Sequence, residues 1–387
     1  MAAIDDVFKA YDIRGVYGEQ IDEDLAWAVG HATSQFLRTK LSGYERGQSS
    51  VNRVVVGRDM RPHSEPLTAA LIEGISCSGA TCVDIGMCDT PMIYFAINHL
   101  GACGGIQVTA SHNPIEYNGF KISGYKAKPI GEATGLEEIK RIAKSVRRMP
   151  SSAALAPVQQ VDLWDEYRKH ILQFLDLKRP MRVAIDASNG MGAKMIPTIF
   201  QETGIEYIPI NFEIGNGFVH PPNPLVPANM KWTQDGVKEH KTDMGICLDG
   251  DADRCMFVDE KGDIVRCDIM TALLGEDFLK SNPGSTIVYD LRSSKVLPEV
   301  IRAAGGIPRR ERVGHAFIKQ AMAETHAVFG GELSGHSYFR DNFHADSAAI
   351  VFAKAISLLS ATDKPLSELV APLLKYSHSG EINFEVE

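Results

Sequence analysis

The chain has 387 residues, and its content of 44% hydrophobic and 23% charged residues excludes intrinsic disorder, a collagen-like repeat and a small disulfide-rich scaffold. Acidic residues (49) outnumber basic residues (40), so the net charge of −9 predicts neither a nucleic-acid nor a membrane partner. Because a single hydrophobic core stops growing near about 250 to 300 residues, we expect three domains of about 100 to 150 residues each.

Short runs rich in Val and Ile recur along the chain, each followed by a Gly-rich or charged loop and then by a helical pattern. We expect strands at residues 53–58, 80–86, 104–109, 181–188, 204–210, 243–249, 285–290 and 305–308, with helices at 65–78 and from residues 193 and 294 onward. This alternation is typical of parallel sheets with helices on both faces. Because the plan of strand, helix and strand occurs three times, we infer a weak repeat of three α/β domains.

Two segments indicate where the domains are joined. The polar stretch 149–157 is the best linker candidate, and the loop at 260–263 is the next. At the end of the chain, Ile382, Phe384 and Val386 alternate with polar residues, which predicts a strand with one buried face. That strand either adds to the third domain or begins a fourth.

The cysteines and the N-terminus indicate the cellular compartment. The seven cysteines include no C-x-x-C pair and lie mostly inside apolar runs, which predicts buried, reduced thiols. Asp5 and Asp6 stand where a signal peptide carries Lys or Arg, and no uncharged apolar stretch approaches about 18 residues. We therefore expect a cytoplasmic protein that is neither exported nor inserted in a membrane.

The strongest motif is a run of alternating acidic residues, Asp249, Asp251 and Asp253, directly after an apolar strand. On a tight turn, three carboxylates can point at one place, which suits a hard divalent cation such as Mg²⁺. The spacing also fits an EF-hand loop that would end at Glu260, but Arg254 stands where that loop needs glycine and a strand precedes it. A solvated acidic turn is disfavoured because three close negative charges repel without a cation.

A second motif places Ser111 beside His112 at the end of an expected strand, in the segment Thr109–Pro114. A serine with an imidazole nearby can act as a nucleophile. Taken alone, the segment is better explained as a plain turn or a helix cap, because Ser, Asn and Pro are common turn residues.

Several basic and polar residues stand beside glycines at expected strand ends, where α/β folds place their sites. They are Arg14, Arg58, Lys121, Arg292, Gly314 with His315, and Glu332 with Ser334. Each cation, taken singly, is better explained as a solvated surface residue. The loop that holds Glu332 and Ser334 could bind vicinal sugar hydroxyls, but it is equally consistent with a hairpin.

Four segments in this order resemble signatures of the α-D-phosphohexomutases, a family that includes phosphomannomutases and phosphoglucomutases. They are Tyr11–Gly15, Thr109–Pro114, Asp249–Arg254 and Gly330–His336. The resemblance covers essentially the whole chain, and the last segment resembles the phosphomannomutase/phosphoglucomutase branch. One departure is Ala252, which replaces a glycine often found between the second and third Asp.

The resemblance implies an α/β fold of three similar mixed-sheet domains in tandem, at residues 1–157, 158–262 and 263–375, which carry the phosphoserine, metal and sugar loops in turn. It implies the interconversion of hexose 6-phosphate and hexose 1-phosphate through a phosphorylated Ser111 and a hexose 1,6-bisphosphate, which also acts as an activator. Mannose is expected before glucose, although these epimers differ at C2, which the matched sugar loop does not read. The partner is thus a small phosphosugar, and the oligomeric state stays open.

The resemblance also implies roles for individual residues. One Mg²⁺ ion would be held by Ser111, Asp249, Asp251 and Asp253. Arg14 and Arg254 would hold charge around the transferring phosphoryl group, and His112, Lys121 and His315 are the candidates for proton transfer. The substrate would be contacted by Arg58, Arg292, Gly314, Glu332 and Ser334, with Glu332 and Ser334 on the sugar O3 and O4.

Family members normally carry a fourth domain whose Arg- and Ser-containing loop clamps the non-reacting phosphate. No such loop occurs in residues 376–387, so we expect this segment to be the first strand of an otherwise absent fourth domain and mutase activity to be impaired in this form. Two alternatives stay open. A metal-dependent sugar phosphatase would use the carboxylates to activate water, and a non-catalytic phosphosugar-binding protein would carry out no transfer.

Overall fold

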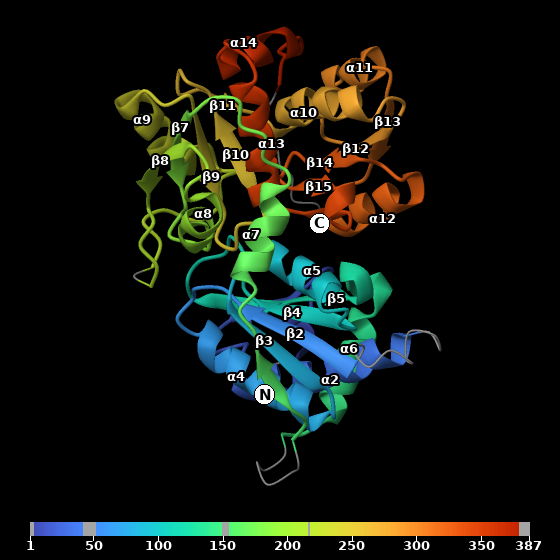
Figure 1. The fold of residues 1–387 in the computed structure, drawn as a ribbon. Helices are drawn as coiled ribbons and strands as arrows, with labels where there is room; N and C mark the ends of the chain where they lie inside the picture. The colour runs from blue at the N-terminus through green and yellow to red at the C-terminus, as the bar shows by residue number, and fades with distance from the viewer. Residues whose placement is uncertain (1–3, 42–51, 149–154, 216, 379–387) are drawn as a thin grey trace, which may run out of the picture.

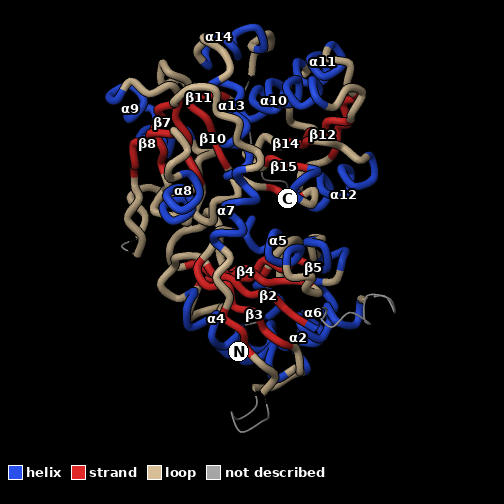
Figure 2. The backbone as a smooth tube through the Cα atoms, in the orientation of Figure 1, coloured by secondary structure: helices blue, strands red, loops and turns tan. Residues whose placement is uncertain are grey.

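The computed structural model describes residues 4–41, 52–148, 155–215 and 217–378. Its polypeptide forms three α/β domains, each built on one sheet (Figure 1). The first domain lies at one end of the molecule, and the second and third lie side by side at the other end. Helix α7 (Trp164–Leu172) runs between the two ends, and the tube in Figure 2 follows the chain through this crossing.

The first sheet contains six strands in the order β1-β5-β4-β2-β3-β6. These strands are β1 (Ile13–Val16), β2 (Arg53–Arg58), β3 (Thr81–Met87), β4 (Gly104–Val108), β5 (Tyr117–Gly124) and β6 (Val158–Gln160). The pairs β2–β3, β2–β4 and β3–β6 are parallel, whereas β5 is antiparallel to both β4 and β1.

The second and third sheets contain five strands each, in the orders β11-β10-β9-β7-β8 and β13-β12-β14-β15-β16. The second sheet consists of β7 (Met181–Asp186), β8 (Ile205–Ile210), β9 (Met244–Leu248), β10 (Cys255–Val258) and β11 (Ile264–Val265). The third consists of β12 (Thr286–Asp290), β13 (Ile307–Glu311), β14 (Phe329–Gly331), β15 (Ser337–Phe339) and β16 (Ala345–Asp346).

The three sheets share one four-stranded core. Across each sheet, the second strand of the core in chain order lies at one side, followed by the first, the third and the fourth. The three spatial orders are β3-β2-β4-β5, β8-β7-β9-β10 and β13-β12-β14-β15. The first three strands are parallel and the fourth is antiparallel to the third. The predicted repeat of three mixed-sheet α/β domains is therefore confirmed. The parallel pairing indicated by the residue pattern holds for the first three strands of each core. The fourth strand returns antiparallel, and a short apolar run does not reveal the direction in which a strand pairs.

Helices cover both faces of the first sheet. The helices of this domain are α1 (Ile4–Val7), α2 (Glu23–Lys40), α4 (Ser64–Cys77), α5 (Thr90–His99) and α6 (Leu136–Ser145). Val54 and Val56 of β2 pack in one cluster with α2, α4 and α6, whereas Val55 packs with α5 on the opposite face. Alternate side chains of a strand point to opposite faces, so this all-valine run is buried from both sides.

The remaining helices belong mainly to the second and third domains. They are α8 (Gly192–Phe200), α9 (Lys231–His240), α10 (Cys267–Ser281), α11 (Val296–Ala303), α12 (His315–Thr325), α13 (Ala348–Ser360) and α14 (Leu366–Val370). Short 3₁₀ turns occur at Tyr125–Ala127, Glu132–Thr134, Pro227–Met230, Arg340–Asn342 and Ala371–Leu373. Within the described ranges, no helix combines the length and the apolar character needed to cross a bilayer.

Two predictions concern the ends of domains. Residue 158 was expected to open the second domain, but β6 pairs with β3 and so belongs to the first sheet. The strand expected within residues 376–387 falls largely on 379–387, and most of the linker candidate falls on 149–154; both segments lie outside the described residues.

Helix α7 is held to the first domain by a buried pair of side chains. The hydroxyl of Tyr167 donates to Asp89 Oδ2 over 2.8 Å, while Asp89 Oδ1 has no hydrogen-bond partner within the described part of the chain. Both residues are almost completely buried. Burial raises the pKa of Asp89 to about 7, because the charged carboxylate has lost its water.

We expect this carboxyl group to make stability fall as the pH rises. Between about pH 4 and pH 7 the folded chain keeps the Asp89 proton that the unfolded chain releases, so the free energy of unfolding falls as the pH rises. The Asp89→Asn variant has no such proton. Chemical denaturation should therefore show that the free energy of unfolding of the variant, relative to that of the parent, rises by about 2 to 3 kcal/mol from pH 5 to pH 8. An equal free-energy difference at both pH values would contradict the shifted pKa.

Candidate active site

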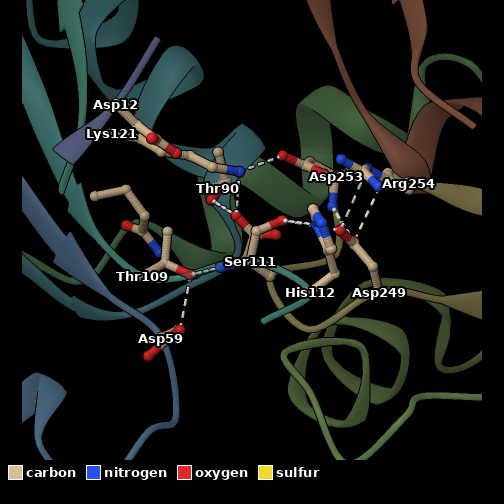
Figure 3. Close-up of polar contacts among 12 residues, drawn as sticks. Asp12, Asp59, Thr90, Thr109, Ser111, His112, Lys121, Asp249, Asp253 and Arg254 are labelled. Carbon is tan, nitrogen blue, oxygen red and sulfur yellow. Dashed lines mark hydrogen bonds and ion pairs between the residues drawn. The ribbon is translucent and has the colours of Figure 1, made fainter. Parts of the chain in front are cut away.

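The site is built from the same turn of each repeat, the connection between the third and fourth strands. Ser111 lies between β4 and β5, Asp249–Arg254 between β9 and β10, and Glu332–His336 between β14 and β15. Because the fourth strand returns antiparallel, a short loop can project from the carboxyl end of the third strand. Figure 3 shows the first two loops meeting, with Ser111 facing Asp249 and His112 beside it.

Ser111 is buried and its backbone is left-handed, with φ of +52°. Its hydroxyl donates to Asp249 Oδ2 over 3.2 Å and lies 3.3 Å from His112 Nδ1. Its N–H donates to Thr109 Oγ1 over 2.9 Å. A non-glycine residue with positive φ is strained, so surrounding contacts must hold the serine in this conformation.

Arg61 provides most of that hold. Its side chain is fully buried and makes five hydrogen bonds, to Asp59 Oδ2 and to the carbonyl oxygens of Ser111, Asn113, Pro114 and Tyr117. A guanidinium can donate in several directions at once, so one side chain fixes the whole loop. Arg58, and not Arg61, was predicted from the sequence to be a site residue; the Asp-x-Arg spacing of residues 59 and 61 is the signal that points to Arg61.

Arg58 lies elsewhere. Its guanidinium is 3.5 Å from Glu65 and lines a groove of about 770 Å³ together with Trp164 and Lys194. None of the other predicted site residues lines that groove. Arg58 and Arg61 therefore leave the same strand end in different directions, and the structure gives no support to a substrate contact from Arg58.

The carboxylates of Asp249, Asp251 and Asp253 offer oxygen atoms within 4.8 Å of one another, and all three residues are buried. Asp249 Oδ1 accepts the N–H groups of Asp253 and Arg254, each over 3.1 Å. Asp251 Oδ1 and Asp253 Oδ1 are buried without a hydrogen-bond partner among the described residues. A hard divalent cation binds carboxylate oxygens, and these two oxygens have no hydrogen bond that such an ion would have to displace. The cluster can therefore hold a metal ion.

Burial and the neighbouring charges of Asp253 and Asp251 raise the pKa of Asp249 well above its ordinary value. Ala252, which stands between the second and third Asp, has a φ of +54°. Glycine adopts this left-handed backbone without cost, whereas an alanine must be held in it by its surroundings.

Lys121 of β5 reaches this cluster from the first domain. Its ammonium group lies 2.6 Å from both Asp251 Oδ2 and Asp253 Oδ2. Burial alone would lower the pKa of Lys121, but these carboxylates outweigh it and raise the pKa above its ordinary value. Lys121 therefore carries a positive charge that compensates the metal loop.

Arg254 joins the metal loop to the sugar loop. Its Nε lies 3.7 Å from Asp249 Oδ2 and donates to His336 Nε2 over 3.1 Å. On its other side, His336 Nδ1 lies 3.3 Å from Asp346 Oδ2, and Lys319 pairs with Asp346 Oδ1 at 2.7 Å. His336 is not among the residues predicted for the site, although it is the last residue of the family-like segment Gly330–His336.

The other predicted residues lie around this junction. Arg14 pairs with Asp12 and donates to Asn113 Oδ1 over 2.6 Å, which places it at the serine loop. Glu332 accepts the N–H of Gly314 over 2.9 Å and the hydroxyl of Tyr338 over 2.5 Å.

In the third domain, Arg292 pairs with Asp290 at 2.9 Å, and the same carboxylate accepts the N–H of Leu333 from the sugar loop. Ser334 lies half-buried on that loop. Burial and the charge of Lys319 lower the pKa of His315 to about 3. Its ring lies 5.5 Å from that of Tyr11 in the first domain.

Three family models match successive parts of the chain, described as phosphoglucomutase/phosphomannomutase alpha/beta/alpha domains I, II and III. They cover residues 5–149, 165–262 and 266–376, respectively. The chain therefore belongs to the phosphoglucomutase/phosphomannomutase family. The predicted family, with its hexose phosphate mutase function and its place among the isomerases, is confirmed.

Particular relatives agree. The phosphomannomutase of Escherichia coli strain K12 is 40% identical over 386 residues, which cover 97% of this chain and 82% of the relative. The phosphomannomutase of Vibrio cholerae is 40% identical over 390 residues, or 98% of this chain and 82% of the relative.

Solved structures show the same fold. A family protein from Burkholderia thailandensis superposes with a TM-score of 0.86 at 32% identity, over 96% of this chain and 80% of its own. A phosphoglucomutase from Paramecium, at 16% identity and a TM-score of 0.71 over 94% of this chain and 76% of its own, shares the fold.

The Arg61→Lys variant tests how the serine loop is held. Lysine has three donors on one atom and cannot reach carbonyl groups in so many directions, so buried acceptors lose their partner. We expect the free energy of unfolding to fall by about 2 to 4 kcal/mol. Arg58→Lys is the matched control and should change the free energy of unfolding by less than about 1 kcal/mol, because the ion pair of Arg58 joins a well-exposed Glu65. Equal effects of the two substitutions would contradict the proposed hold.

Proposed function

We propose that this protein is a phosphohexomutase that moves a phosphoryl group between O6 and O1 of a hexose, through phosphorylated Ser111 and a hexose 1,6-bisphosphate. The observation that carries the proposal is the Ser111 hydroxyl, held at 3.2 Å from Asp249 Oδ2 across the boundary of two domains. The relatives named phosphomannomutase favour mannose as the hexose, with glucose as a second substrate. The bisphosphate serves as the activator that phosphorylates the serine.

We further propose that Asp249, Asp251 and Asp253, together with Ser111 once it is phosphorylated, hold one Mg²⁺ ion. The unpartnered Oδ1 atoms of Asp251 and Asp253 support this assignment. When bound, the ion neutralises charge on the phosphoryl oxygens.

The chain's own cations surround the transferring group in this proposal. Arg14 of the first domain contacts the serine loop through Asn113. Arg254 of the second domain lies 3.7 Å from Asp249 Oδ2, which accepts the Ser111 hydroxyl. Guanidinium groups held in place before the reaction stabilise charge that develops in the transition state. We assign the two arginines this role.

Proton transfer is assigned to residues with opposite charge states. His112 Nδ1 lies 3.3 Å from the Ser111 hydroxyl, and burial together with the cations Arg254 and Arg14 lowers the pKa of His112 to about 2, which keeps its imidazole neutral. The position of His112 supports its assignment as the group that accepts a proton near Ser111. Lys121 is charged and can donate one. His315, also neutral, is the candidate for the opposite side of the sugar.

The third domain is assigned the sugar. The Glu332 carboxylate would accept hydrogen bonds from the sugar hydroxyls at O3 and O4, and the Ser334 hydroxyl would bond to the same pair. Gly314 and Arg292 would lie beside the bound sugar. Tyr338 and the Gly314 N–H hold the Glu332 carboxylate in place.

We propose domain limits near 160, 262 and 375. The cytoplasm is the proposed location, because all seven cysteines are free and all but Cys77 are buried.

The Ser111→Ala variant tests the phosphoserine. Mass spectrometry of the parent protein treated with a hexose 1,6-bisphosphate should show one added phosphoryl group on Ser111 and none on the variant. Conversion of mannose 1-phosphate should fall at least about 1000-fold in the variant, because the group that carries the phosphoryl is gone. Phosphate release that continues undiminished in Ser111→Ala would instead indicate a phosphatase.

The Glu332→Gln variant tests the sugar loop. Glutamine has a single acceptor oxygen, so it cannot serve the Gly314 N–H, the Tyr338 hydroxyl and a sugar hydroxyl equally well. We expect kcat/KM for mannose 1-phosphate to fall about 10- to 100-fold, the loss that one hydrogen bond to a charged group predicts. The control Glu324→Gln, on the exposed surface of α12, should leave kcat/KM unchanged. If both variants keep the parent value, Glu332 does not contact the sugar.

A further inference from the structure

Thr90 connects the first domain to the metal loop of the second. It is the first residue of α5, it is almost completely buried, and it lies outside all four motifs. Its N–H donates to the carbonyl oxygen of Asp251 over 3.0 Å, and its hydroxyl donates to Asp251 Oδ2 over 2.5 Å. The N–H and the hydroxyl of Thr90 therefore both donate to Asp251 of the acidic cluster, and Figure 3 draws Thr90 among the residues of the site.

These contacts divide the two oxygens of the Asp251 carboxylate. Oδ2 receives the Thr90 hydroxyl and the Lys121 ammonium, whereas Oδ1 is buried and has no hydrogen-bond partner in the described ranges. A carboxylate bound through one oxygen cannot rotate freely, so the other oxygen keeps its direction. Groups that orient a ligand in this way contribute to the affinity of the ion.

The two donors to Oδ2 differ in charge. Lys121 is a cation, and a divalent ion bound to the same carboxylates would repel it. Thr90 is neutral and is anchored by its own N–H bond to the Asp251 backbone, so its hydroxyl can stay in place whether or not the ion is bound.

We propose that Thr90 is a positioning residue that orients Asp251 for the metal ion, so that the first domain controls the affinity of a site whose carboxylates belong to the second. The inference rests on the proposed metal site. It adds to that site the hydroxyl of Thr90, which donates to Asp251 Oδ2 and leaves Asp251 Oδ1 for the metal ion.

The test uses the full chain and Mn²⁺ as the probe, since carboxylate sites accept it and its electron paramagnetic resonance reports free ion directly. Thr90→Val keeps the shape and the N–H but removes the hydroxyl, and we expect it to weaken Mn²⁺ binding about 10- to 100-fold. Thr90→Ser restores the hydroxyl and should bind within about 3-fold of the parent.

Thr33→Val is the matched control. Thr33 lies on α2 of the same domain, is fully buried, and its hydroxyl has no hydrogen-bond partner among the described residues. This variant should bind Mn²⁺ like the parent. Melting temperatures measured without metal show the temperatures at which every variant is folded. The lower Mn²⁺ affinity of Thr90→Val should persist at those temperatures.

The outcomes are distinct. Unchanged affinity in Thr90→Val, or equal losses in Thr90→Val and Thr90→Ser, would overturn the positioning role and leave the metal site in place. No Mn²⁺ binding by the parent chain would overturn the metal site itself, and the positioning role with it.

Discussion

The structure depends on the balance of three buried carboxylates where the first and second domains meet. Asp249, Asp251 and Asp253 lie too close to be ionised together without compensation. The compensating charge comes from both sides, as Arg254 from the metal loop and Lys121 from the first domain. The ion pairs of Lys121 with Asp251 and Asp253 therefore join the first and second domains at the proposed metal site.

A repeated fold explains how three different loops reach one place. Each domain supplies the turn between its third and fourth strands, and in the first two domains that turn carries the serine and the acidic cluster. Close approach requires small residues at the contact. A side-chain carbon at Gly250 would lie 2.4 Å from the carbonyl oxygen of Ser111, and one at Gly190 would lie 2.6 Å from that of Gly250. A larger residue at Gly250 would separate the serine loop from the metal loop.

Residues beneath the loops hold them in conformations that the loops would not adopt alone. Arg61 uses five hydrogen bonds to keep Ser111 in a left-handed backbone. His336 connects Arg254 to Asp346 and Lys319, so the third domain contributes to the same network. In the proposed function, such supports hold the serine and acidic loops at fixed distances before substrate binds, as preorganised phosphoryl transfer requires.

The residue pattern was enough to predict the α/β class, the threefold repeat and the family, and to select Ser111 and the three aspartates as candidate site residues. Strand periodicity and ordered short motifs are local properties of the chain. Other features depend on neighbours that are distant in sequence. Tertiary structure alone showed that Arg61 and not Arg58 turns toward the serine loop, and that Lys121 bridges two aspartates about 130 residues away. The hydrogen bonds between Thr90 and Asp251 were likewise visible only in the tertiary structure. The physical reason is that a side chain's direction and partners are set by packing between elements, which no residue pattern within a single element contains.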